Sequence, residues 1–72
     1  MMRTYSFYMY RVASTVPQLT FENLAEDGDA CALAARRLGA SSRNVSIEVF
    51  DVEDDAIADR LVVSLRRDRG ER

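Results

Sequence analysis

The chain has 72 residues, 47% of them hydrophobic, and a formal net charge of −2. A chain of this length makes one domain with a small core and leaves no room for a separate substrate or cofactor domain. It has no histidine, no tryptophan and one cysteine, and all ten basic residues are arginine. These absences exclude a histidine-based catalytic triad, an internal disulfide and a cysteine-based zinc site.

Charge is distributed unevenly along the chain. Residues 1–21 carry +2, residues 22–59 carry −7 because ten acids stand against three arginines, and residues 60–72 carry +3. An acidic middle argues against simple nucleic-acid binding. No apolar run approaches the roughly 18 to 20 residues of a transmembrane helix, and the first residues lack the pattern of a signal peptide. We therefore expect a cytoplasmic protein with no membrane association.

Residues 4–12 predict a first strand, because aromatic and β-branched side chains fit a pleated surface. Alternation places one set of large side chains on one face of this strand: Tyr5, Phe7 and Met9. The opposite face carries a second set: Tyr8, Tyr10 and Val12. The second set needs its own cover, so we predict that it is a dimer face or a stacking face.

A connection through Pro17 leads to Gln18–Glu22, which either forms a second strand or stays irregular. Residues 29–38 predict a helix, since an apolar stripe recurs at helical spacing. The stripe consists of Ala30, Cys31, Ala34 and Leu38. Asp27 or Asp29 is predicted to cap its N-terminus, and Gly39 is predicted at the position just after its C-terminus. We predict that Cys31 packs in the core.

Two further strands are predicted at residues 45–50 and 60–66, from alternation of apolar and polar side chains, and they should pair as an antiparallel hairpin. The sequence therefore predicts an α+β two-layer sandwich in the order β-(β)-α-β-β. One helix packs on a three- or four-stranded, mainly antiparallel sheet. Residues 1–67 form the single domain, and residues 68–72 form a charged tail.

Acidic side chains gather in two groups that are candidate partner-binding residues. They are Glu22, Glu26, Asp27 and Asp29 in the first group, and Asp51, Glu53, Asp54, Asp55 and Asp59 in the second. The second group imitates the start of a calcium-binding loop. It has Ala56 where that loop needs glycine and Val62 where it needs glutamate, so no metal site is predicted.

Several segments together resemble a group of short, uncharacterised bacterial proteins of GC-rich proteobacteria. The matching segments are Tyr5 to Tyr10, Glu26 to Leu38, Ile47 to Asp51 and Asp59 to Val62. Phe50 replaces a tryptophan of that group, and the hairpin connection is longer. The resemblance implies the fold and no activity, since the group has no established one.

We expect a non-enzymatic protein–protein interaction module that forms a homodimer, with no catalytic residues, cofactor or metal. One alternative is a small inhibitor, of the kind encoded by phages or mobile elements, whose acidic middle blocks a basic nucleic-acid-binding protein. Another alternative is a binder of single-stranded nucleic acid, which would stack bases on Tyr8 and Tyr10. The acidic charge disfavours this last alternative.

Overall fold

The computed structural model describes residues 2–52 and 60–67. Its elements are β1 (Arg3–Arg11), β2 (Gln18–Leu24), α1 (Asp27–Gly39), β3 (Asn44–Asp51) and β4 (Arg60–Arg66). The α+β class and the element order are confirmed. Residues 18–22, for which the sequence did not decide between a strand and an irregular segment, lie in the strand β2. The acidic connection and the charged tail lie outside the described residues.

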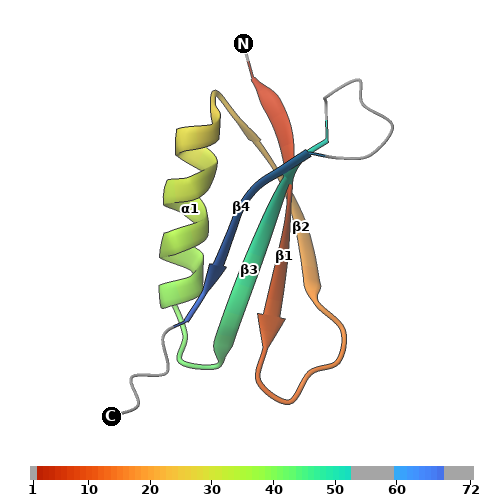
Figure 1. Ribbon diagram of the computed structural model, residues 1–72, viewed down its shortest axis with the longest axis vertical. Coiled ribbons are helices and arrows are strands. Elements are labelled where there is room, and N and C mark those ends of the chain that lie inside the picture. Colours follow the sequence, from red (N-terminus) through yellow and green to blue (C-terminus); the bar gives the residue numbers. More distant parts are fainter. Residues whose placement is uncertain (1, 53–59, 68–72) are drawn as a thin grey trace.

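The four strands form one antiparallel sheet in the order β2-β1-β3-β4. β1 and β3 are therefore central, and β2 and β4 are the edges. The helix α1 lies on one face of this sheet and runs mainly along β3 and β4 (Figure 1). In the part of the chain that the structure describes, no element lies on the other face. One helix covers one face, as predicted, and the sheet has four strands.

The core lies between α1 and the sheet. Tyr5, Phe7 and Met9 of β1 point into it, at 0%, 1% and 8% exposure, as their alternation predicted. The remaining buried apolar residues are Ile47 and Val49 of β3 and Ala30, Ala34 and Leu38 of α1. Two alanines on the buried stripe let the helix axis approach the sheet closely. Cys31 is only partly buried and is not among the core residues, so the prediction that it packs in the core is wrong.

The N-terminus of α1 is not held as predicted. The cap position is Glu26, whose side chain makes no capping hydrogen bond, and Asp27 is already helical. The predicted capping role of Asp27 or Asp29 is therefore wrong. The Asp27 carboxylate instead accepts hydrogen bonds from Tyr5 and Arg60, which fastens the start of the helix to the sheet.

The C-terminus of α1 is also held by side chains. Gly39 is the last helical residue and Ala40 at the cap is right-handed, with φ −72° and ψ −19°, so the predicted role of Gly39 beyond the helix is wrong. The Asn44 amide donates to the Arg37 carbonyl at 2.8 Å, and Arg67 donates to the Leu38 carbonyl at 2.6 Å. These donors satisfy carbonyls that the end of a helix leaves without partners.

The connection from β1 to β2 begins with a tight turn. Arg11 is the last residue of β1, so Val12 lies in the turn rather than in the strand. Ala13 has φ 62°, the left-handed conformation that non-glycine residues rarely adopt. This conformation is unfavourable for an L-residue by roughly 1–2 kcal/mol, because its Cβ comes too close to the backbone.

Replacing Ala13 by glycine removes this strain, so we expect Ala13→Gly to raise the free energy of unfolding by about 0.5–1 kcal/mol in urea denaturation. The matched control is Ala35→Gly, at an exposed position inside α1. There glycine should lower stability by about 1 kcal/mol. A loss of stability in Ala13→Gly would show that the turn needs the side chain.

Candidate interaction surface

The face of the sheet opposite α1, here called the open face, is built by alternate residues of all four strands. The strand registers place these residues on it: Thr4, Ser6, Tyr8 and Tyr10 of β1, Leu19, Phe21 and Asn23 of β2, Ser46, Glu48 and Phe50 of β3, and Leu61, Ser64 and Arg66 of β4. Ser6 pairs with Phe21 on one side and with Phe50 on the other. Large apolar side chains thus reach from one edge of the sheet to the other.

Three apolar side chains of this face are largely in solvent. Phe21 is 60% exposed, Leu61 52% and Leu19 44%. They lie on the two edge strands, so they flank the aromatic centre from both sides. Single exposed apolar residues are common on protein surfaces, whereas a contiguous group on one face is typical of an interaction site.

The aromatic centre of the open face is held by local contacts. The rings of Tyr8 and Phe50 meet edge to face, with centroids 5.6 Å apart and an interplanar angle of 87°. The Tyr10 hydroxyl donates to the Glu48 carboxylate at 3.2 Å. Burial of Tyr10, together with this hydrogen bond, raises its pKa. These contacts hold the rings of Tyr8, Tyr10 and Phe50 in place on the open face.

Ser6 lies at the centre of the open face and is 1% exposed. Its Oγ has no hydrogen-bond partner among the described residues. Phe21 and Phe50 are its register partners on the two neighbouring strands. A buried hydroxyl without a partner is unfavourable by about 1–3 kcal/mol.

Of the three residues predicted for a dimer or stacking face, Tyr8 and Tyr10 lie on the open face, as alternation required, whereas Val12 lies beyond the end of β1. Sequence reasoning missed that Phe21 and Phe50 join them. Both follow strand alternation, so the missing information was the register between strands, which a single sequence does not supply.

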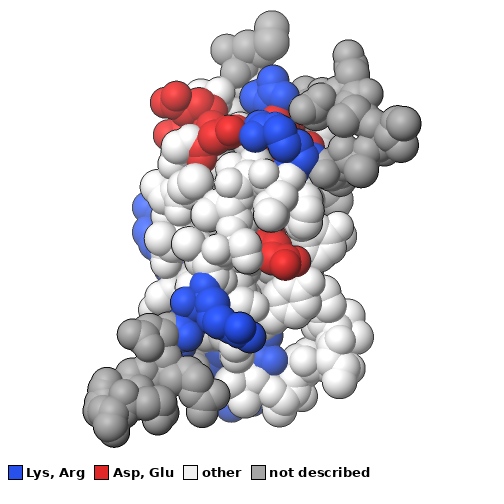
Figure 2. Space-filling view, in the orientation of Figure 1, with Lys and Arg blue, Asp and Glu red and all other residues white. Residues whose placement is uncertain are grey.

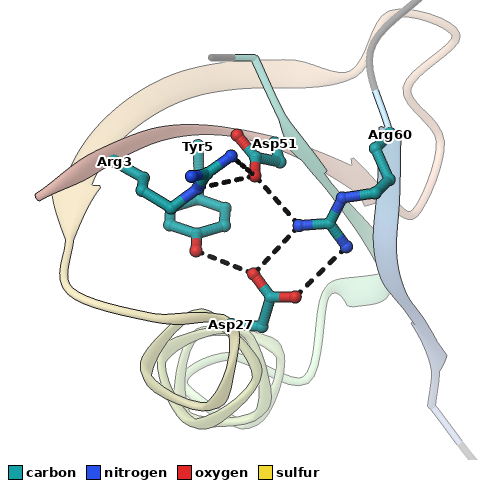
Figure 3. Close-up of polar contacts among 5 residues, drawn as sticks. All are labelled: Arg3, Tyr5, Asp27, Asp51 and Arg60. Atoms are coloured by element: carbon teal, nitrogen blue, oxygen red, sulfur yellow. Dashed lines mark hydrogen bonds and ion pairs between the residues drawn. The ribbon is translucent and has the colours of Figure 1, made fainter. Parts of the chain in front are cut away.

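A second feature concerns the acidic residues. Asp51, at the end of β3, is 0% exposed. Its carboxylate receives the Arg3 guanidinium at 2.6 Å and the Arg60 guanidinium at 2.9 Å (Figure 3). Arg60 continues to Asp27 at 3.1 Å, and the Tyr5 hydroxyl donates to the same carboxylate at 2.8 Å. We call these five residues the Asp51 cluster.

The Asp51 cluster changes the pKa of its members. Burial and the hydrogen bond to Asp27 raise the pKa of Tyr5 to about 12. Hydrogen bonds from Arg60 and Tyr5 lower the pKa of Asp27 below its usual value. At neutral pH the cluster therefore holds two carboxylates, two guanidiniums and a neutral phenol, an arrangement suited to fastening α1 to the sheet rather than to proton transfer.

Most described members of the predicted acidic surface are paired. Asp27 and Asp51 belong to the Asp51 cluster, and Glu22 binds Arg37. Asp51 is buried, so the expectation that it faces a partner is wrong. Glu26 and Asp29 are exposed near the start of α1. The others, Glu53, Asp54, Asp55 and Asp59, lie outside the described residues.

Figure 2 shows how the charges are arranged on one side of the molecule. Acidic and basic atoms lie together at the end where α1 begins, whereas the described charges at the other end are basic. The surface between the ends is mostly uncharged. Within the described residues no group of acidic and thiol side chains is placed to hold a metal ion.

Comparisons with protein-family models, curated proteins and solved structures returned no match to the chain. The likeness to the proteobacterial group therefore stays a prediction from the sequence pattern. No described helix is long and apolar enough to cross a membrane.

The burial of Asp51 generates a stability prediction. Asp51→Asn leaves two guanidiniums without their shared counter-charge, so we expect a loss of about 2–4 kcal/mol in the free energy of unfolding, measured by chemical denaturation. Asp29→Asn, at the exposed start of α1, should change stability by less than about 0.5 kcal/mol. Equal effects of the two substitutions would contradict a structural role for the cluster.

The raised pKa of Tyr5 predicts an alkaline loss of stability. The phenol ionises near pH 10 when unfolded and near 12 when folded, so its contribution is complete below pH 10 and is lost between pH 10 and 12. Unfolding midpoints in urea across this range should fall, and Tyr5→Phe should flatten the decline. An identical decline in the variant would assign the loss to other groups.

Proposed function

We propose that this chain is a non-enzymatic interaction module that associates with a second copy of itself through the open face. The observation that carries the proposal is the contiguous aromatic and aliphatic surface on the side of the sheet that α1 leaves uncovered. Its outermost members, Phe21 and Leu61, are each more than half exposed.

The size of the open face sets the expected strength of this association. Strands about 4.8 Å apart, rising about 3.3 Å per residue, give four seven-residue strands a footprint of roughly 440 Å². Two such faces, treated as flat, bury roughly 900 Å² in total, which is near the lower limit for specific complexes. We therefore expect a dimer with a dissociation constant in the micromolar range rather than an obligate one.

The polar residues of the open face favour a second copy as the occupant. Glu48 lies near the centre and Arg66 at the margin, one strand away. A two-fold interface brings each surface patch against its own copy, so a contact between an acid and a base on the same face is formed twice. A face with both charges is complementary to itself, and the apolar residues around them supply the buried area.

The alternatives find less support. A nucleic-acid platform needs flat, accessible rings in a positive field, whereas here Tyr8 meets Phe50 edge to face and Glu48 lies among the rings. An inhibitor that imitates phosphates needs free carboxylates, and three of the five described members of the predicted acidic surface, Glu22, Asp27 and Asp51, are occupied by arginines. Neither alternative explains the exposure of the apolar edge residues.

Sedimentation velocity over a hundredfold range of protein concentration tests the proposal. The chain should shift from monomer to dimer, and Phe21→Gln should weaken the dimer about tenfold or more, since large side chains dominate interface energies. Phe21 is exposed on an edge strand, so the variant should fold normally by circular dichroism. The matched control, Val16→Gln, changes a 73% exposed residue in the β1–β2 connection and should leave association unchanged.

Two results would refute the proposal. One is a monomer at millimolar concentration. The other is a dimer that Phe21→Gln and Val16→Gln affect equally, because association would then use another surface.

A further inference from the structure

Outside the open face, an open hollow lies at the basic end of the molecule. It has a volume of about 260 Å³ and is lined by Arg11, Val12, Ala13, Ser14 and Arg43. It lies where β1 leaves the sheet and where the connection after α1 enters β3. Two arginines from segments far apart in the sequence therefore line the same space.

The backbone fixes these two arginines beside each other. A register shift between Tyr10 and Arg11 pairs Arg11 with Asn44, the residue after Arg43. The Val12 N–H then donates to the Arg43 carbonyl at 2.8 Å, which ties the two segments together. Two guanidiniums that line one hollow without a described counter-charge give it a positive potential, which favours an anion there.

The described residues do not supply that anion. No described carboxylate lines the hollow. Arg3, Arg37 and Arg60 are paired with acids, and Arg67 binds carbonyls at the end of α1. Within the same part of the chain, neither Arg11 nor Arg43 has an ion-pair partner. Arg36 and Arg66 also have no described ion pair, so what distinguishes Arg11 and Arg43 is that both line the same hollow.

We propose that the hollow binds the phosphoryl group of a small anionic ligand between Arg11 and Arg43. Two guanidiniums carry a charge of +2, which matches a phosphate dianion, whereas a carboxylate would neutralise only one of them. Guanidinium presents its N–H groups as a planar fork that binds phosphate oxygens in pairs. The Ser14 hydroxyl donates to the Val16 carbonyl, so the arginines are the donors that hold the ligand.

The strained turn contributes to this site. Ala13 is held at φ 62° in the wall of the hollow. Backbone strain of this kind persists where the surrounding structure fixes the residue, and it is concentrated at functional sites. Here the turn at Ala13 lies beside the loop that carries Arg43.

An NMR titration of the full chain with inorganic phosphate and with pyrophosphate tests the proposal. At low ionic strength we expect saturable shifts of the Val12, Ser14 and Arg43 amides, with tighter binding of pyrophosphate. The double variant Arg11→Gln and Arg43→Gln should bind at least about tenfold more weakly. The matched control, Arg36→Gln, removes an exposed arginine of α1 outside the hollow and should bind as the parent chain does.

Three results would overturn the proposal: no saturable binding of either anion, equal weakening in the control, or acetate bound as tightly as phosphate. The proposal would also be overturned, in favour of a nucleic-acid surface, if an oligothymidylate bound to the chain while phosphate and pyrophosphate did not. Arg11 and Arg43 lie outside the open face, so the result does not depend on whether the chain dimerises.

Discussion

The structure depends on a mismatch between one helix and one sheet. The central strand β1 carries large side chains on both faces, and α1, with thirteen residues, packs on only one of them. Tyr5, Phe7 and Met9 are buried beneath it, whereas Tyr8 and Tyr10 remain at the surface with Phe21 and its neighbours. Burial of apolar area is the main source of stability in a chain of this size, so an apolar face left in water favours association.

The last strand decides where the helix lies. Arg60 at the start of β4 binds Asp27 in the first turn of α1, and Arg67, just after β4, binds the Leu38 carbonyl in its last turn. The two contacts fasten both ends of α1 along β3 and β4 and add to the packing of its buried residues Ala30, Ala34 and Leu38. The apparent excess of arginine in the C-terminal part is thus partly structural and is a weak argument for a nucleic-acid partner.

Alternation predicted β1, β3 and β4 and the division of β1 into two faces, because apolar periodicity reports burial directly, whereas residues 18–22 stayed open between a strand and an irregular segment. Alternation also implies the position of Asp51. This residue continues the series Val45, Ile47 and Val49, every second residue of the strand, and therefore falls on the covered face. Alternation does not reveal the partner of each carboxylate. Arg3 and Asp51 are 48 positions apart, and Asp27 prefers Arg60 to the helix N-terminus only because the fold brings them together.

Pairing in three dimensions also changes the meaning of the net charge. The middle of the chain counts −7, yet three of its six described acids, Glu22, Asp27 and Asp51, are paired with arginines, which come from the first strand, the helix and the last strand. A linear charge count therefore overstates the acidic surface and conceals the basic one. The described arginines that remain without an ion pair include Arg11, Arg36, Arg43 and Arg66, and of these Arg11 and Arg43 line one hollow. The position of these two charges, rather than the total of −2, is the reason for proposing an anionic ligand.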